Sequence, residues 1–126
     1  MTKVLHVHAS PKREYSASGQ MADIFLDEYR KINPAHEIET LSLFESDLPE
    51  FGFDQTTAKF APIFGDQLTQ EQEQKWQVIL DVISRFDKAD KIIVSTPMWN
   101  GSIPYKLKHY IDIIVQPLVT FGFNPE

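Results

Sequence analysis

Three serines lie close together near the start of the chain, and their spacing suits the binding of a phosphate group. Ser10, Ser16 and Ser18 supply hydroxyl groups, and Ser16 or Ser18 is placed to cap a helix. A helix N-terminus offers free backbone N–H groups and the positive end of the helix dipole. Lys12 and Arg13 add positive charge to the same loop. These residues indicate an anion cradle; the alternative is a surface loop whose serines only cap the helix.

A second segment, Pro97–Gly101, combines side chains that suit a planar ring. Met98 and Trp99 offer polarisable and flat apolar surface, and Asn100 offers amide donors and an acceptor. Gly101 allows a ligand to approach the backbone closely. The alternative is that Met98 and Trp99 are core residues at a tight turn. On spacing alone the two interpretations are about equally good.

The elements that must position these loops alternate between strand and helix. β-branched runs predict three strands, and apolar residues at three- and four-residue spacing predict three helices. This alternation is typical of an α/β fold with a parallel sheet. The segment from Phe44 to Leu68 holds prolines and glycines and is expected to be irregular. We expect strands at Val4–Ala9, Ile38–Leu43 and Lys91–Thr96, and helices from Ser18 to Asn33, from Thr69 to Phe86 and between Pro104 and Pro117.

The predicted topology brings the two loops to one crevice. In a doubly wound sheet, ligands bind at the carboxyl ends of the strands, where the strand order reverses. If the first and third strands are neighbours, the loops that follow them meet there. The chain has neither a G-x-x-x-x-G-K-[ST] loop nor a G-x-G-x-x-G fingerprint. A hydroxyl-rich loop without those glycines suits a single terminal phosphate, such as that of FMN.

Composition limits the other classes of function. The 126 residues contain no cysteine, which excludes a disulfide framework, a thiolate metal site and a cysteine nucleophile. The formal charge of −6 is a poor basis for nucleic-acid binding. No apolar run is long enough to span a bilayer and no signal peptide is visible, so we expect no membrane contact and a cytoplasmic location. His6 and His8 share a strand face, but a metal site needs further ligands, and none is expected.

The two loops resemble a known family. The run Ser95–Pro104 and the later residues Leu107, Lys108 and Tyr110–Asp112 closely resemble the FMN-dependent NADH:azoreductase family. That family was formerly labelled acyl carrier protein phosphodiesterase and is related to the NAD(P)H:quinone oxidoreductases. The residues of the first loop and Val119–Phe121 also match it. The resemblance extends over nearly the whole chain, and its Pro-Met-Trp-Asn stretch is the most specific part.

The resemblance implies a flavodoxin-like doubly wound parallel sheet and a flavoprotein function. It implies an oxidoreductase that carries electrons from NADH or NADPH through FMN to a quinone or azo compound, without catalytic side chains because the flavin carries the chemistry. It also implies a homodimer. The FMN phosphate would be bound by Ser10, Ser16, Ala17 and Ser18, and the flavin ring by Pro97, Met98, Trp99, Asn100 and Gly101.

The chain departs from the family's pattern in two places. The family often has Phe where this chain has Gly101, so aromatic cover over the flavin would be lost there. The fold would also be truncated after the third strand and third helix. Residues 1–126 would then form the N-terminal portion of an FMN-binding domain. The alternative function is a module that binds FMN without turnover. A phosphodiesterase is disfavoured because the loops show neither metal ligands nor a nucleophile.

Overall fold

The structure is a computed structural model that describes residues 1–122 and 124. It has three parallel strands, β1 (Lys3–His8), β2 (Glu37–Ser42) and β3 (Lys91–Ser95). They form one sheet in the order β2-β1-β3. In register, His8 lies between Ser42 of β2 and Ser95 of β3. The predicted α/β class, parallel pairing and adjacency of the first and third strands are therefore confirmed.

The chain divides into two compact units. The first consists of Met1–Leu48 with Lys88–Tyr110, and the second of Pro49–Asp87 with the described residues from Ile111 onward. The whole sheet and both predicted ligand loops belong to the first unit. The main buried apolar side chains of the first unit are Val4, Leu5, Val7, Ala9, Ala22, Leu26, Leu41, Leu43, Leu107 and Tyr110, and those of the second are Ala58, Ala61, Ile79, Ile83, Ile113 and Ile114.

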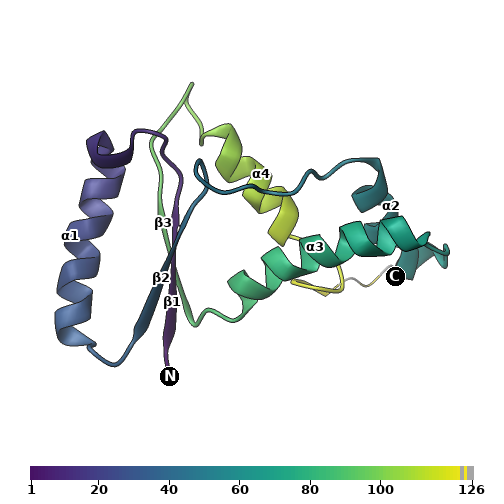
Figure 1. Cartoon of the computed structure of the whole chain (residues 1–126), viewed down its shortest axis with the longest axis horizontal. Helices are drawn as coiled ribbons and strands as arrows, with labels where there is room; N and C mark the ends of the chain where they lie inside the picture. Colours follow the sequence, from purple (N-terminus) through teal and green to yellow (C-terminus); the bar gives the residue numbers. More distant parts are fainter. Residues whose placement is uncertain (123, 125–126) are drawn as a thin grey trace. The chain divides into compact units, whose positions relative to one another are not determined.

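Helix α1 (Ala17–Ile32) lies along one face of the sheet, and a short 3-10 turn, η1 (Arg13–Tyr15), precedes it (Figure 1). Apolar spacing predicts a buried stripe of Met21, Ala22, Phe25, Tyr29 and Ile32, but Met21, Phe25 and Ile32 are 73%, 53% and 76% exposed. Ala22 is buried as predicted, together with Leu26, which the predicted stripe left out. The prediction was wrong for Met21, Phe25 and Ile32, because the helix packs through the side that carries Ala22 and Leu26.

Helix α2 (Phe53–Phe64) corrects the expectation that this part of the chain is irregular. Gly52 is its N-cap, and the Gly52 N–H donates to Gln55 Oε1 at 3.0 Å. Gly65 ends the helix with a positive φ of 75°, a conformation that glycine adopts without a steric cost. Pro62 lies in the last turn, where it does not prevent the preceding turns from forming. The glycines that suggested a loop therefore mark the helix ends.

Helices α3 (Gln70–Asp87) and α4 (Tyr105–Ile114) follow the predicted pattern. Thr69 and Gln72 form a capping box at the start of α3, since the Gln72 N–H donates to Thr69 Oγ1 and the Thr69 N–H donates to Gln72 Oε1, both at 3.1 Å. Pro104 immediately precedes α4, and its carbonyl accepts from the Leu107 N–H at 3.0 Å. The described residues form four α-helices where three were expected, because α2 was missed.

Candidate functional site

The two predicted ligand loops meet at the carboxyl end of the sheet, within the first compact unit. Figure 1 shows the loops that follow β1 and β3 leaving the sheet at the same end. Between them lies a pocket of about 410 Å³, within the usual range of about 300–1,000 Å³ for small-molecule sites. The pocket is lined by Ser10, Pro11, Lys12, Ser16, Ala17, Ser18, Met21, Thr96, Pro97, Met98 and Trp99.

The serine-rich side of this pocket, which we call the serine cradle (Ser10–Ser18), has the geometry of an anion site. Ser16 is the N-cap of α1, where its Oγ accepts from the Gly19 N–H at 3.0 Å and its carbonyl accepts from the Gln20 N–H at 2.9 Å. The N–H groups of Ala17 and Ser18 precede these at the helix end, where no intrahelical acceptor exists. They therefore point toward any anion bound at the cradle.

Hydroxyl groups and one cation complete the serine cradle. Ser16 Oγ and Ser18 Oγ lie 3.1 Å apart, and Ser10 Oγ accepts from the Lys12 N–H at 3.3 Å. Ser10 and Ser16 are buried, which fixes their positions, whereas Lys12 is exposed. Arg13 was expected to add charge here, but it lines a different pocket and its Nε lies 3.7 Å from Glu45 Oε1.

The second loop, Pro97–Ser102, forms a tight hairpin. The Trp99 N–H donates to the Ser102 carbonyl at 2.8 Å, and the Ser102 N–H donates to the Trp99 carbonyl at 2.9 Å. Asn100 and Gly101 form its tip with φ of 51° and 74°, as an Asn-Gly turn of type I′ requires. Both are exposed and neither lines the pocket. The structure thus brings Pro97, Met98 and Trp99 to the serine cradle, but not these two.

Phe44 is a residue that the sequence interpretation left in an irregular segment. Its ring lies 5.6 Å from that of Trp99 and 5.7 Å from that of Tyr105, the latter edge-on. Phe44 follows β2 closely, and a residue just after a parallel strand lies at the same sheet edge as the other loops. The position of Phe44 just after the second predicted strand could therefore have identified it as a residue near the site. The contact orients Trp99, which is 36% exposed, at the rim of the pocket.

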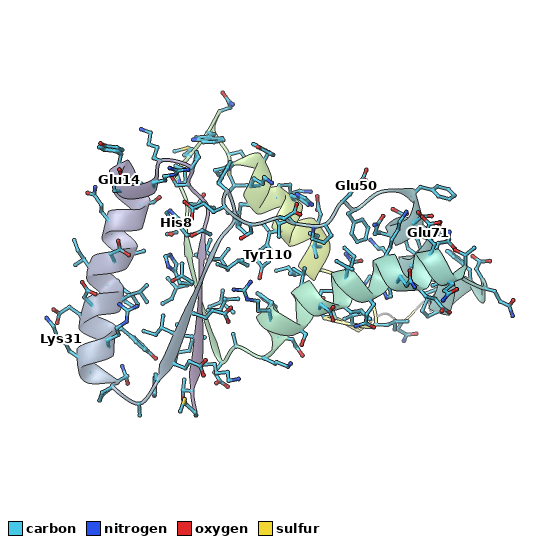
Figure 2. All side chains as sticks on the ribbon, viewed as in Figure 1. His8, Glu14, Lys31, Glu50, Glu71 and Tyr110 are labelled. Atoms are coloured by element: carbon cyan, nitrogen blue, oxygen red, sulfur yellow. The ribbon has the colours of Figure 1, made fainter. Side chains whose placement is uncertain are left out.

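A second, smaller pocket of about 240 Å³ lies between α1 and the sheet in the same unit. His6 and His8 line it, and Ser10 belongs to both pockets. Figure 2 shows His8 in the space between α1 and the sheet. Burial, and to a lesser degree the neighbouring His8, lowers the pKa of His6 below its ordinary value of 6.5, while Asp23 acts in the opposite direction. The neutral form of the His6 ring is therefore favoured.

Two searches over the described residues bear on other functions. Within residues 1–122 and 124, no three side chains among the histidines, aspartates and glutamates come together as a candidate metal site. In the same part of the chain, every helix is too short or too polar to cross a bilayer.

The larger pocket fits FMN by the chemistry of its lining. One side presents serine hydroxyls, helix-end N–H groups and Lys12, which together suit a phosphate monoester. The other side presents Pro97, Met98 and Trp99, which suit a flat ring system. A polar cradle and an apolar platform in one pocket match a ligand that is anionic at one end and aromatic at the other.

Comparison with known proteins places the chain among flavodoxin-like proteins. A family profile described as a flavodoxin-like fold matches residues 2–126. The chain is 44% identical over 124 residues to a Burkholderia lata protein named FMN-dependent NADH:quinone oxidoreductase 9, covering 98% of the chain and 59% of that protein. It is 42% identical to an FMN-dependent NADH:quinone oxidoreductase of Desulfotalea psychrophila, covering 100% of the chain and 59% of that protein.

Solved structures give the same result. A crystal structure of azoreductase from Bacillus anthracis str. Sterne superposes with a TM-score of 0.87 at 32% identity, covering 99% of this chain and 61% of that one. An FMN-dependent NADH-azoreductase of Bacillus anthracis str. Ames Ancestor, solved in complex with FMN, gives 0.85 at 26% identity, covering 99% and 60%. The chain therefore spans about 60% of the length of the relatives that it matches.

Proposed function

This chain belongs to the family of the flavodoxin-like fold, and from that premise we propose that the protein is an FMN-dependent oxidoreductase. It transfers electrons from NADH or NADPH, through FMN, to quinones or azo compounds. One observation carries the proposal. The serine cradle and the apolar residues Pro97, Met98 and Trp99 line a single pocket at the carboxyl ends of two adjacent parallel strands.

In this proposal the chain's own residues bind and orient the cofactor. Ser10, Ser16, Ala17 and Ser18 hold the phosphate through hydroxyl and backbone N–H groups, and exposed Lys12 adds favourable charge. Bound FMN supplies the ability to accept and release a pair of electrons, which protein side chains lack.

The hairpin loop holds the ring in place. Met98 and Trp99 offer the surface on which the flavin ring rests, and Phe44 keeps the Trp99 ring oriented. Asn100 and Gly101 contact the ring from the hairpin tip, through the Asn100 amide and the Gly101 backbone. Since both lie outside the pocket lining, this contact requires the tip to bend toward the ligand.

The relatives support the choice of reaction. The curated relatives are named FMN-dependent NADH:quinone oxidoreductases, and the solved neighbours are named azoreductases. Quinones and azo compounds share a conjugated, planar system that accepts two electrons. An acceptor of this kind suits a pocket rim that carries exposed Met98 and Trp99.

We further infer that the protein is a cytoplasmic homodimer and that residues 1–126 act as one FMN-binding domain. Large exposed apolar side chains on α1, among them Met21, Phe25 and Ile32, support self-association. Light scattering after gel filtration tests it: a mass near 29 kDa, twice the chain's 14.5 kDa, is expected, and a mass of 14.5 kDa contradicts the dimer.

The proposed function is tested by titrating the purified chain with FMN. In a Trp76→Phe background, Trp99 is the sole tryptophan and reports on the pocket. Saturable quenching is expected at micromolar FMN, a range in which binding contributes about 8 kcal/mol. Riboflavin, which lacks the phosphate, is the matched control and binds more weakly if the serine cradle holds the phosphate.

Turnover is measured next, with NADH and menadione or methyl red as acceptor. NADH oxidation that depends on both FMN and acceptor is expected. Quenching by FMN without NADH oxidation, and without anaerobic bleaching of the bound flavin by NADH, supports the alternative of a module that binds FMN without turnover. The absence of FMN binding contradicts both.

A further inference from the structure

Two histidines and a serine form a hydrogen-bonded cluster beneath the proposed FMN pocket. Ser95 Oγ lies 2.7 Å from His6 Nε2 and 2.9 Å from His8 Nδ1. Two of its members are buried, since His6 is 3% and Ser95 8% exposed, whereas His8 is half-buried. Polar groups at this depth cost free energy unless they are hydrogen-bonded, so the geometry of the cluster is tightly constrained.

The hydrogen-bonding capacity of a serine hydroxyl couples the two imidazoles. The Ser95 hydroxyl has one proton, so it donates to one ring and accepts an N–H from the other. Thr40 Oγ1 lies 3.4 Å from His6 Nδ1 and is placed to serve the other nitrogen of that ring. A row of hydrogen-bonding contacts therefore runs from Thr40 of β2 through His6 of β1 to Ser95 of β3, and His8 joins it at Ser95. Removing the Ser95 hydroxyl therefore takes a hydrogen-bonding partner from both imidazole rings.

The cluster joins the two strands from which the ligand loops emerge. His8 is the last residue of β1 and Ser95 the last of β3, and the Ala9 N–H also donates to the Ser95 carbonyl at 2.9 Å. Ser10 begins the serine cradle two residues after His8, and Pro97 begins the hairpin loop two residues after Ser95. A change in the distance between these strand ends is therefore transmitted directly to the width of the pocket.

His8 also contacts the helix end that forms the serine cradle. A Cβ built at Gly19 would lie 2.8 Å from His8 Cε1, so the His8 ring packs closely against the first turn of α1. The Gly19 N–H donates to Ser16 Oγ, the cap of that turn. A larger residue at this position would displace the His8 ring. One side chain thus contacts β3 through Ser95 and, at Gly19, the helix turn that Ser16 caps.

We propose that His6, His8 and Ser95 are positioning residues that set the spacing between the serine cradle and the hairpin loop. In this role they control the affinity for FMN without touching it. The inference rests on the proposed function for its link to FMN, whereas the spacing itself is a property of the chain alone. The two parts are separable by experiment.

The first test removes the central hydroxyl with Ser95→Ala and restores it with Ser95→Thr. FMN affinity is measured at a temperature at which thermal unfolding curves show every variant folded. We expect the dissociation constant to rise about tenfold in Ser95→Ala, the loss that follows when a buried hydrogen-bonding partner is removed. Ser95→Thr restores most of the affinity. The matched control is Ser42→Ala, because Ser42 flanks His8 from β2 in register but lies outside the cluster.

A second pair of variants avoids a change at the buried serine. His8→Asn keeps an amide close to the position of Nδ1, and His8→Leu removes the hydrogen-bonding group from this half-buried site. Affinity near that of the unmodified chain is expected for His8→Asn and weaker binding for His8→Leu. Equal affinities in all variants of both pairs overturn the proposal.

A readout without FMN separates this proposal from the proposed function. In the Trp76→Phe background, the emission maximum and acrylamide quenching of Trp99 report the position of the hairpin loop. We expect both to change in Ser95→Ala and to return in Ser95→Thr. If no variant binds FMN, the proposed function fails, and the Trp99 signal alone decides the positioning role. An unchanged Trp99 signal in Ser95→Ala then overturns it.

Discussion

The two faces of β1 differ in chemistry, although they belong to the same six residues. Leu5 and Val7 are each 1% exposed and lie on the face away from α1, as the alternation of a strand requires. His6 and His8 lie on the face toward α1, where they line a polar pocket. The apolar face stabilises the fold through burial, whereas the polar face connects the strand ends that carry the ligand loops. Because side chains alternate along the strand, Leu5 and Val7 stabilise the fold on one face, and His6 and His8 have the proposed positioning role on the other.

The apolar face is expected to give the largest effect on stability. Leu5→Ala creates a cavity in a fully buried site and should lower the free energy of unfolding by about 2–5 kcal/mol. Chemical denaturation measures it. The control is Ile24→Ala on α1, which is 68% exposed and should change stability by no more than about 0.5 kcal/mol. A loss below about 1 kcal/mol for Leu5→Ala contradicts the assignment of this face as core.

The helix cap at the serine cradle is expected to affect both stability and FMN binding. Ser16→Ala removes the acceptor for the Gly19 N–H and should cost about 1 kcal/mol of stability, with weaker FMN binding. Ser16→Asp keeps a good cap but places a negative charge beside the phosphate. Unfolding curves and FMN titrations of the two variants separate the roles. If Ser16→Asp binds FMN as well as the unmodified chain, the phosphate does not lie at Ser16.

The hairpin tip is expected to contribute a smaller effect. Gly101 has a φ of 74°, so Gly101→Ala should cost about 1 kcal/mol or shift the hairpin. Stability and Trp99 emission measure the two outcomes. Ser102→Ala, next to it and exposed, is the control. If Gly101→Ala changes neither quantity, the positive φ is not required.

The polar face is expected to make stability depend modestly on pH. The pKa of His6 is lower in the folded chain than its ordinary value of 6.5, because burial disfavours the charged ring. The unfolded chain therefore binds a proton more readily as the pH falls below about 7. The stability associated with the neutral His6 ring is fully present above pH 6.5. It is lost as the pH falls toward the pKa that His6 has in the folded chain.

The variant His6→Gln isolates this contribution. Gln keeps an amide near the position of Nε2 but does not titrate. Denaturation between pH 7.5 and 5.5 should show the unmodified chain losing more stability than His6→Gln. Equal losses in both would mean that the pKa of His6 is not lowered by folding.

Much of this fold could be predicted from local patterns in the sequence. The β-branched run of β1, the Ser16 cap and the reciprocal Thr69 and Gln72 contacts depend on residues within a few positions of one another, and the structure has all of them. The type I′ turn at Asn100 and Gly101 was equally readable, since that dipeptide is a strong hairpin signal. Its consequence was missed: the two residues form the exposed tip of the hairpin and are not among the residues that line the pocket.

Other features depended on contacts between distant parts of the chain. Helix α2 was missed because Pro62 and its flanking glycines are breakers in isolation, and only the packing of Ala58 and Ala61 gives this helix a buried face. The buried stripe of α1 was predicted only in part, since Ala22 is buried as expected but Leu26 is buried where Met21, Phe25 and Ile32 were expected.

The sequence by itself determined a parallel α/β chain whose serine-rich and aromatic loops follow the first and third strands, because period and turn chemistry are local. Only the tertiary structure decided that His6 and His8 share the hydroxyl of Ser95, which lies 89 and 87 residues away. Strand order and register create that contact, and neither can be read from the spacing of the residues in the sequence. From the sequence, His6 and His8 were expected to be ordinary strand histidines. Strand order and register place them directly beneath the proposed site.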